Sequence, residues 1–397
     1  MPRYGGQMLI ENSTLICGGR SIGGQSNQFY NVWNHIKQEY SAGSTDQPKM
    51  SVMAGAGDIP PLGNTAGGYD YNATYTPPGL STYTNALWAG AAQCTGQTSS
   101  GVNQLAKDGT AANNPIYQNG LPQVIDVFNE TLESIEPSML PTFLMQSTYV
   151  DLGFAAPACL IGPATGVPTY QICNVTMQGT VYALGQQFRD FHTSYIQAGN
   201  IIQCPFKSVQ AWPGALSQGM DVQLNFSVAS QSIDQLTACF LDSAYRTNGP
   251  VVAGTNTSKY FTLGKGTGVR QMSWQINGQS NPSFPVGPKH AWGQTVTDMG
   301  LWRAGHGTYK NLNSYAAYLT KWFVWSYSTS MPFAECLTRA ISGLNTENSN
   351  AQLSLVVQSD PTNTAAAIES YANFPLVFIT STSTLNIGQG GQISVSV

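Results

Sequence analysis

Strict alternation of apolar and polar residues in four short segments constrains the fold of this chain more than any other sequence feature. The segments are residues 221–228, 271–276, 352–358 and 392–397. In the first of them Val222, Leu224 and Phe226 alternate with polar neighbours. A period of two places successive side chains on opposite faces of a β-strand, so one face packs on a core and the other meets solvent or a partner. Each segment is therefore predicted to be a half-buried strand.

The spacing of these strands favours an all-β protein. They are separated by Gly and Pro turns and lack the regular intervening helices of βαβ units, which is typical of antiparallel sandwiches. One amphipathic helix is predicted at 121–136, where apolar residues recur at intervals of three and four and Pro137 ends the pattern. The aromatic stretch 313–322 is a second candidate helix. Residues 40–120, rich in Gly, Ser, Thr, Asn and Pro, are predicted to form long loops with short strands between them.

The chain is long enough for two such sandwiches. With 397 residues it exceeds one average domain of about 150 residues. Each half contains a short helical insertion followed by strand pairs, although the two halves share little sequence. We therefore predict a first domain at 1–190 and a second at 191–397, with the boundary inside 185–199.

The composition excludes several classes of protein. Charged residues make up 9% of the chain, against about 25% in an average soluble protein, while hydrophobic residues make up 42%. The 8 Trp, 15 Phe and 19 Tyr are too many for a disordered chain. A net charge of −4 without any basic run disfavours binding to nucleic-acid phosphates. Uncharged polar surfaces instead suit contacts between copies, because an ionic group buried at a contact must be desolvated.

No catalytic, cofactor or metal site is assigned from the sequence. The seven cysteines contain no CxxC pair and are expected to be isolated buried thiols. The four histidines have no metal or triad spacing, and the glycine-rich strings 18–24 and 264–268 match no phosphate-binding loop, so turns are expected there. Glu130, Glu133 and Glu136 are attributed to a solvated helix face. The N-terminus does not resemble a signal peptide, and no apolar run is long enough to span a membrane.

From residue 200 onward the order of motifs resembles the second jelly roll of the double jelly-roll major capsid proteins. This family is shared by tailless icosahedral double-stranded DNA viruses, including virophages, polinton-like viruses and the bacteriophage–adenovirus lineage. The matching segments are 202–206, 223–228, 233–236, 272–282, 333–335, 341–346, 351–357, 377–379 and 385–397. In the first half, 140–152 followed by 170–177 is similar to the closing strands of the family's first jelly roll, and residues 1–120 match nothing. The low charge and the short first half depart from many members.

The resemblance implies a structural role without enzymatic activity. It implies two consecutive eight-stranded antiparallel jelly rolls, and three chains forming a pseudo-hexameric capsomer that tiles an icosahedral shell. The expected partners are further copies of the chain, penton proteins and minor capsid proteins, with an internal lipid membrane left open and no sequence-specific nucleic acid. The expected location is the virion, assembled inside the host cell. No cofactor is implied.

One aromatic segment is a candidate for subunit contacts. Trp322, Phe323, Trp325 and Tyr327 lie close together in the sequence, and aromatic residues are enriched at protein interfaces. Packing of the same residues in the core of the sandwich is an equally good interpretation, and the sequence alone leaves both open.

Other functions also remain open at this point. A secreted β-sandwich that binds or acts on glycans is consistent with the Asn, Gln, Thr and aromatic content. A surface-layer or appendage subunit would assemble head to tail instead of as closed trimers. A minor capsid or penton protein is the nearest rival, but such proteins commonly need a single jelly roll.

Overall fold

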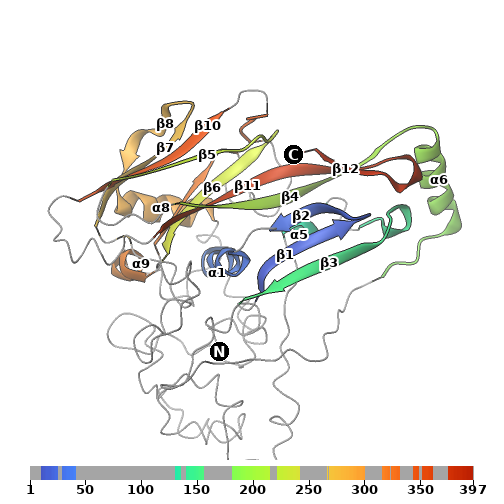
Figure 1. Cartoon of the computed structure of the whole chain (residues 1–397), viewed down its shortest axis with the longest axis horizontal. Helices are drawn as coiled ribbons and strands as arrows, with labels where there is room; N and C mark the ends of the chain where they lie inside the picture. Colours follow the sequence, from blue (N-terminus) through green and yellow to red (C-terminus); the bar gives the residue numbers. More distant parts are fainter. Residues whose placement is uncertain are drawn as a thin grey trace, which may run out of the picture.

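The computed structural model of the protein describes thirteen stretches of the chain. These are residues 10–25, 29–41, 130–135, 140–155, 181–214, 221–241, 266, 268–299, 315–321, 323–330, 343–347, 351–360 and 374–396. Antiparallel strands dominate them, and a few short helices lie at the faces and ends of the sheets (Figure 1).

Eight strands of the second half form a sandwich of two sheets. In chain order they are β4 (Ile202–Pro213), β5 (Val222–Ser227), β6 (Ile233–Leu241), β7 (Val269–Ile276), β8 (Gln279–Val286), β9 (Val324–Ser328), β10 (Gln352–Ser359) and β11 (Phe374–Ile387). One sheet has the order β5-β10-β7-β8. In the other, β4 pairs with β11, which pairs with β6, which pairs with β9.

The pairing shows how the chain is wound. The first of the eight strands pairs with the last (β4 with β11), the second with the seventh (β5 with β10), the third with the sixth (β6 with β9) and the fourth with the fifth (β7 with β8). All four pairs are antiparallel, as in a long hairpin that has been rolled up on itself into two sheets. This strand order is that of a jelly roll.

The main hydrophobic core fills the space between the two sheets. Trp274 on β7 and Trp325 on β9 stack with their ring centroids 5.1 Å apart, which joins the sheets at the centre of the sandwich. Both indoles are fully buried. The alternating residues of β5 face this core, because Phe226 is buried whereas Gln223 and Asn225 are exposed.

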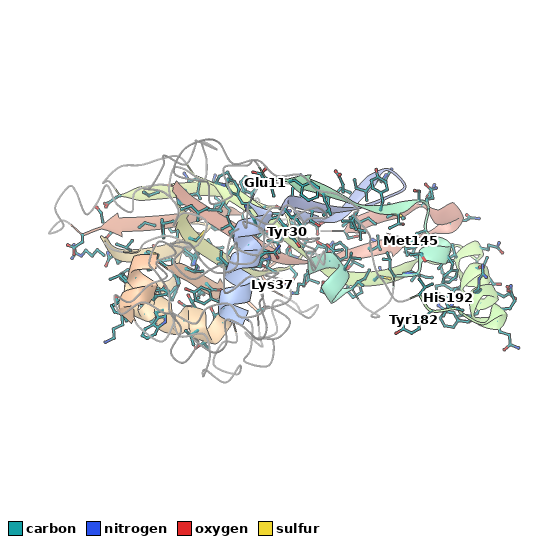
Figure 2. All side chains as sticks on the ribbon, turned by 90° about the horizontal axis from the view of Figure 1, so that it is seen from below. Glu11, Tyr30, Lys37, Met145, Tyr182 and His192 are labelled. Carbon is teal, nitrogen blue, oxygen red and sulfur yellow. The ribbon has the colours of Figure 1, made fainter. Side chains whose placement is uncertain are left out.

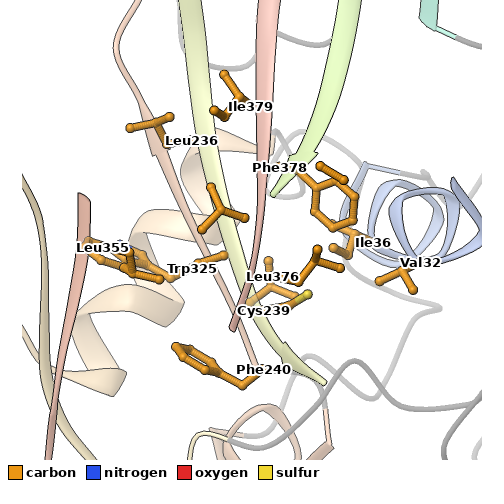
Figure 3. Packing of buried hydrophobic residues seen from close by; sticks show 14 of the residues in the cluster. Val32, Ile36, Leu236, Cys239, Phe240, Trp325, Leu355, Leu376, Phe378 and Ile379 are labelled. Atoms are coloured by element: carbon orange, nitrogen blue, oxygen red, sulfur yellow. The ribbon is translucent and has the colours of Figure 1, made fainter. Parts of the chain in front are cut away.

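The sheet that contains β11 is covered on its outer face as well. The helix α1 (Tyr30–Ser41) lies there, and Trp33 packs 5.1 Å from Phe378 between ring centroids. Figure 3 shows Val32 and Ile36 of α1 beside Phe378 and Leu376 of β11. Burial on both faces explains why every residue of β6 is buried.

The first half of the chain contributes a three-stranded antiparallel sheet of order β2-β1-β3. Its strands are β1 (Ile10–Cys17), β2 (Arg20–Gln25) and β3 (Thr148–Phe154). A second hydrophobic cluster joins this sheet and α5 (Glu130–Ser134) to the far ends of β4 and β11, through Leu15, Phe206 and Leu385 among others. The long strands β4 and β11 therefore contribute side chains to both cores, and β12 (Ile393–Ser396) extends the sheet beside β11.

Helix side chains cap the edge strand β9. The helix α8 (Pro288–Asp298) runs alongside it, where Thr295 Oγ1 donates to the Val324 carbonyl (2.8 Å) and accepts from the Ser326 N–H (3.0 Å). Asp298 Oδ2 accepts from the Ser328 N–H (2.9 Å). These outward backbone groups would otherwise be open to pairing with another strand.

The opposite edge of the same sheet is capped in a similar way at Lys207 of β4. There Ser134 Oγ of α5 accepts from the Lys207 N–H (2.6 Å), and Thr131 Oγ1 donates to the Lys207 carbonyl (3.2 Å). Thr131 and Ser134 are three residues apart on their helix, as are Thr295 and Asp298 on α8, which is the spacing that puts two side chains on one helix face.

Most of the predicted elements are confirmed in the described residues. The four alternating segments are the strands β5, β7, β10 and β12, and α9 (Tyr315–Lys321) lies within the predicted 313–322 helix. The predicted helix 121–136 is confirmed at 130–134; residue 135 follows the helix, and 121–129 and 136 lie outside the described residues. Of the loops predicted at 40–120, residues 40 and 41 instead belong to the end of α1, and 42–120 lie outside the described residues. Gly18 and Gly19 form the β1–β2 turn with φ of 56° and 77°.

The all-β class and the second jelly roll are thus confirmed. The predicted first jelly roll is described only through β1, β2 and β3. The proposed boundary at 185–199 is occupied by a helix that the sequence reasoning did not predict, α6 (Gln186–Gln197), which projects at one end of the molecule (Figure 1).

Candidate functional site

The predicted interface segment lies mostly inside the sandwich. Phe323 and Trp325 are fully buried in the main core, so packing in the core, the second interpretation of this segment, accounts for both rings. The Trp325 indole N–H donates to Gln294 Oε1 of α8 (3.0 Å). Tyr327 is partly buried against the same core, and Trp322 lies outside the described residues. Neither Phe323 nor Trp325 has surface to offer a neighbouring subunit.

Exposed aromatic side chains gather instead at α6. Phe188, Phe191, His192 and Tyr195 recur at intervals of three and four, which puts them on one face of the helix. We call these four residues the aromatic face of α6. The exposed fractions are 46% for Phe188, 65% for Phe191 and 42% for Tyr195, whereas large apolar side chains of a folded chain are usually buried.

The rings of this face contact one another. His192 lies 4.1 Å from Phe188 between ring centroids and meets Phe191 edge-on at 5.4 Å. One imidazole nitrogen, Nδ1, is 2.9 Å from the Phe188 carbonyl oxygen, which fixes the ring against the helix. Phe143, from the short helix η5 (Thr142–Leu144), approaches His192 edge-on at 6.3 Å. Aromatic pairs at such separations stabilise each other by about 0.5–1.5 kcal/mol.

Very little of α6 is anchored to the rest of the chain. Ile196 is its one buried residue and joins the second hydrophobic cluster. The face opposite the rings is polar and exposed, with Gln186 Nε2 donating to Asp190 Oδ1 (2.8 Å). Figure 2 shows Tyr182 and His192 together at this end of the molecule, and Tyr182 is 65% exposed.

A shallow cavity of about 430 Å³ lies at the β1–β2 turn, where it meets the end of β11 and the start of β12. Its walls include Cys17, Arg20, Gln146, Ile201 and Asn386. The Arg20 guanidinium donates from Nη1 to the Ile393 carbonyl (3.2 Å), so this cation ties the turn to β12. The cavity holds no group of acids, histidines and thiols that would make it a catalytic centre.

The fully buried ion pair of the described residues joins two strands of one sheet. Lys207 Nζ and Asp234 Oδ2 form a fully buried ion pair at 2.5 Å between β4 and β6. Asp234 also accepts from Ser232 (2.7 Å) and Thr382 (2.7 Å). Burial raises the pKa of the Asp234 carboxyl, and the Lys207 ammonium and the two hydroxyls partly offset this effect. The partners of the Asp234 carboxylate are therefore side chains on the strands and turns of the sandwich.

Asp298 is a second buried acid with a raised pKa. Burial raises its pKa from an ordinary value of 3.8 to about 7, and the hydrogen bond from the Ser328 N–H partly opposes the shift. Perturbed acids often mark catalytic sites. Here the carboxyl caps the edge of β9, so its environment follows from a structural role.

Metal-binding clusters and membrane-spanning helices are absent from the described part of the chain. There, no cluster of three or more His, Cys, Asp or Glu side chains is placed to hold a metal ion. Within the same residues, no helix has the length and apolar character needed to cross a membrane. Cys17, Cys204 and Cys239 are free and buried, as expected for isolated thiols.

The comparisons with known proteins give likenesses of structure only. No family model and no curated protein matches the sequence. The chain is similar to the PBCV-1 virus capsid, with a TM-score of 0.42 and 12% identity over 99% of this chain and 84% of that one. It is similar to a chain of the Sputnik virophage, with a TM-score of 0.43 and 10% identity over 99% of this chain and 75% of that one. It is also similar to the mavirus major capsid protein, with a TM-score of 0.35 and 8% identity over 98% of this chain and 77% of that one. The jelly roll itself rests on the strand pairing described above.

Sequence reasoning missed the aromatic face of α6, although a signal was present. The spacing of Phe188, Phe191, His192 and Tyr195 is that of a helix. The segment was instead assigned to the boundary between the two domains, from Gly185 to Gly199. In the structure these glycines bound the helix: Gly185 is its N-cap residue, and Gly199 follows its C-cap with φ of 86°.

Proposed function

We propose that this protein is a major capsid protein, a structural component of an icosahedral virion. The observation that carries the proposal is the strand pairing of β4 to β11, which is that of a jelly roll, a fold used by viral capsid domains. The motif order from residue 200 onward, which resembles the second jelly roll of the double jelly-roll capsid proteins, supports the same conclusion.

The arrangement of the two halves supports a double jelly roll. The β2-β1-β3 sheet and α5 pack against the ends of β4 and β11, and α1 covers the outer face of the second sandwich. A first sandwich built on 1–190 would stand beside the second, built on 191–397. Three such chains would place six sandwiches around a three-fold axis, which gives a pseudo-hexameric capsomer able to tile a shell.

The chemistry of the chain supports assembly instead of catalysis. Asp234 and Asp298, two buried acids, are bound into the sheets, and most of the exposed large apolar side chains lie in and beside α6. We propose contacts with other copies first, then with penton and minor capsid proteins, within the virion. The proposal assigns no cofactor and no enzymatic activity.

The test is the mass of the native full-length protein by light scattering, followed by negative-stain imaging of the same peak. A species near three times 42.5 kDa with a hexagonal outline is expected. A monomer at every concentration tested would overturn the trimeric capsomer. Glycan-binding screens would then test the alternative of a β-sandwich that binds sugars.

A further inference from the structure

We infer that the aromatic face of α6 is a contact surface between copies of this chain. The inference rests on the proposed function, because it names the part of the subunit that meets its neighbour. Three features of α6 carry it: the exposed aromatic area, the sparse packing of the helix on the other described residues, and the absence of a net charge that would select another kind of partner.

The exposed area is large for a single short helix. Phe188, Phe191 and Tyr195, together with Tyr182 just before the helix, are between 42% and 65% exposed. Taking about 200 Å² for each aromatic side chain, they present on the order of 400 Å² of ring surface. The largest apolar patch on a typical monomer is about 300–600 Å², and it is often functional. A stable interface needs about 800 Å² from each partner, so this patch supplies about half of one partner's share.

The second feature is that α6 lacks the packing that normally holds a helix. It has 12 residues, and only Ile196 is buried. Isolated helices shorter than about 12–15 residues are marginal in water, and most helices in proteins are stabilised by burying an apolar face. His192 meets Phe143 and Ile196 joins the second cluster at one edge of this face, but Phe188, Phe191 and Tyr195 stay 42–65% exposed, so a neighbouring chain is the natural source of further stabilisation.

The third feature selects a second copy over other occupants. Arg189 and Asp190 are the charged residues of the helix, and they cancel. Helices that lie on membranes carry several Lys or Arg on the polar face, which α6 lacks. A highly charged partner would find no complementary charge either. A copy of this chain, with 9% charged residues, presents a surface of matching polarity.

The experiment compares the full-length protein with two triple variants. In the first, Phe188→Ser, Phe191→Ser and Tyr195→Ser remove the aromatic face. In the control, Gln186→Ser, Arg189→Ser and Asp190→Ser change the same number of exposed residues on the other sides of the helix, with no change in net charge. Light scattering over a dilution series gives the concentration at which each assembly half-dissociates.

We expect the first variant to dissociate at a concentration at least about a hundredfold higher than the wild type, because buried aromatics dominate interface energies. The control should match the wild type. If the wild type is trimeric and both variants dissociate alike, the aromatic face is not the contact and only this inference fails. If the wild type is monomeric throughout, the proposed function fails as well.

Hydrogen exchange in the wild type gives a readout that does not depend on a variant folding. Amides of 186–197 should exchange at least about tenfold more slowly in the assembled protein than in the dissociated chain, because packing on a neighbour suppresses local opening. Equal exchange in both states would overturn the inference. So would flotation of the wild type, but not of the aromatic variant, with phosphatidylcholine–phosphatidylglycerol vesicles, because the face would then belong to a lipid surface.

Discussion

Removing the ammonium of Lys207 while keeping the Asp234 carboxyl should destabilise the second jelly roll strongly. The test is Lys207→Met, which keeps an unbranched side chain of similar length in a fully buried position. It leaves Asp234 with the hydroxyls of Ser232 and Thr382 as donors but without its counterion.

The structure sets the size of this effect. At the 2.5 Å separation of Lys207 Nζ and Asp234 Oδ2, the Coulomb attraction is about 7 kcal/mol for an effective dielectric constant of about 20. Most of it offsets the cost of removing both charges from water, so the net worth of the intact pair is small. Breaking a buried pair costs about 3–5 kcal/mol, because one charge stays buried without compensation. The two remaining hydroxyl donors place the expected loss near 3 kcal/mol.

The loss should depend on pH in a defined direction. Burial already raises the pKa of Asp234, and the Lys207 ammonium opposes that shift. Without the ammonium the folded-state pKa rises further above the unfolded value. The variant therefore binds a proton more readily when folded, so its stability is recovered as the pH falls and lost as the pH rises through the folded-state pKa.

Urea unfolding followed by tryptophan fluorescence, at about pH 5 and about pH 7.5, measures both effects, because Trp274 and Trp325 lie in the same sandwich. The double variant Lys207→Met with Asp234→Asn is the control. It carries no buried charge at this site, so it should recover most of the loss and show no pH dependence from this site. A single variant within about 0.5 kcal/mol of the wild type, or a double variant no better than the single one, would refute the reasoning.

Three further predictions concern the sandwich and its edge. In the wild type, the free energy of unfolding should fall by on the order of 4 kcal/mol as the pH rises from about 4 to about 7, because the Asp298 carboxyl with its raised pKa favours the folded state only while protonated. Asp298→Asn should abolish this loss. Equal pH profiles of the two proteins in urea unfolding would contradict the prediction. Phe226→Asp should prevent folding, because its unpaired carboxylate would enter the core at a cost of several kcal/mol, and soluble protein with native circular dichroism would show that the assigned strand phase is wrong. Thr295→Val should lower the free energy of unfolding by about 1–3 kcal/mol, because it leaves the Ser326 N–H of β9 without an acceptor while the Val324 carbonyl keeps the Tyr318 hydroxyl as a donor. Thr295→Ser should restore the acceptor, and equal stability of the Val and Ser variants would argue against the cap.

Strands with one buried face were the part of the fold that the sequence predicted well. In β5 the alternation of Val222, Leu224 and Phe226 with polar residues reports directly that one face of the strand is buried. In β6 both faces are buried and the pattern disappears, so only its first residues, near Ile233, were recognised. The strand β11 runs from Phe374 to Ile387, past the end of the apolar run at Ile379, because its second part pairs with β4 and β12 through a Ser- and Thr-rich segment.

The helices were harder to predict because each is held by different forces. The helix α8 packs Ala291, Trp292 and Val296 against the main core but also turns Thr295 and Asp298 to β9, so polar residues interrupt the apolar stripe that a periodicity argument would detect. The helix α1 does carry such a stripe, including Trp33 and Ile36, but it buries these side chains on a face of the sheet that a single-sandwich interpretation leaves to solvent. The interface prediction placed on Phe323 and Trp325 shows that aromatic content alone does not distinguish a core from a contact surface.

The caps on the outer strands have a consequence for the proposed assembly into a shell. Thr295 and Asp298 occupy backbone groups along β9, and Thr131 and Ser134 do the same at Lys207 of β4. Neighbours cannot extend this sheet from one molecule to the next at those positions, so the route to fibrous growth is blocked there. In the proposed assembly, subunits then bind one another through side-chain patches that are each weak and separately reversible. A wrongly seated subunit can leave before its neighbours fix it in place, which allows a closed shell to correct its own errors.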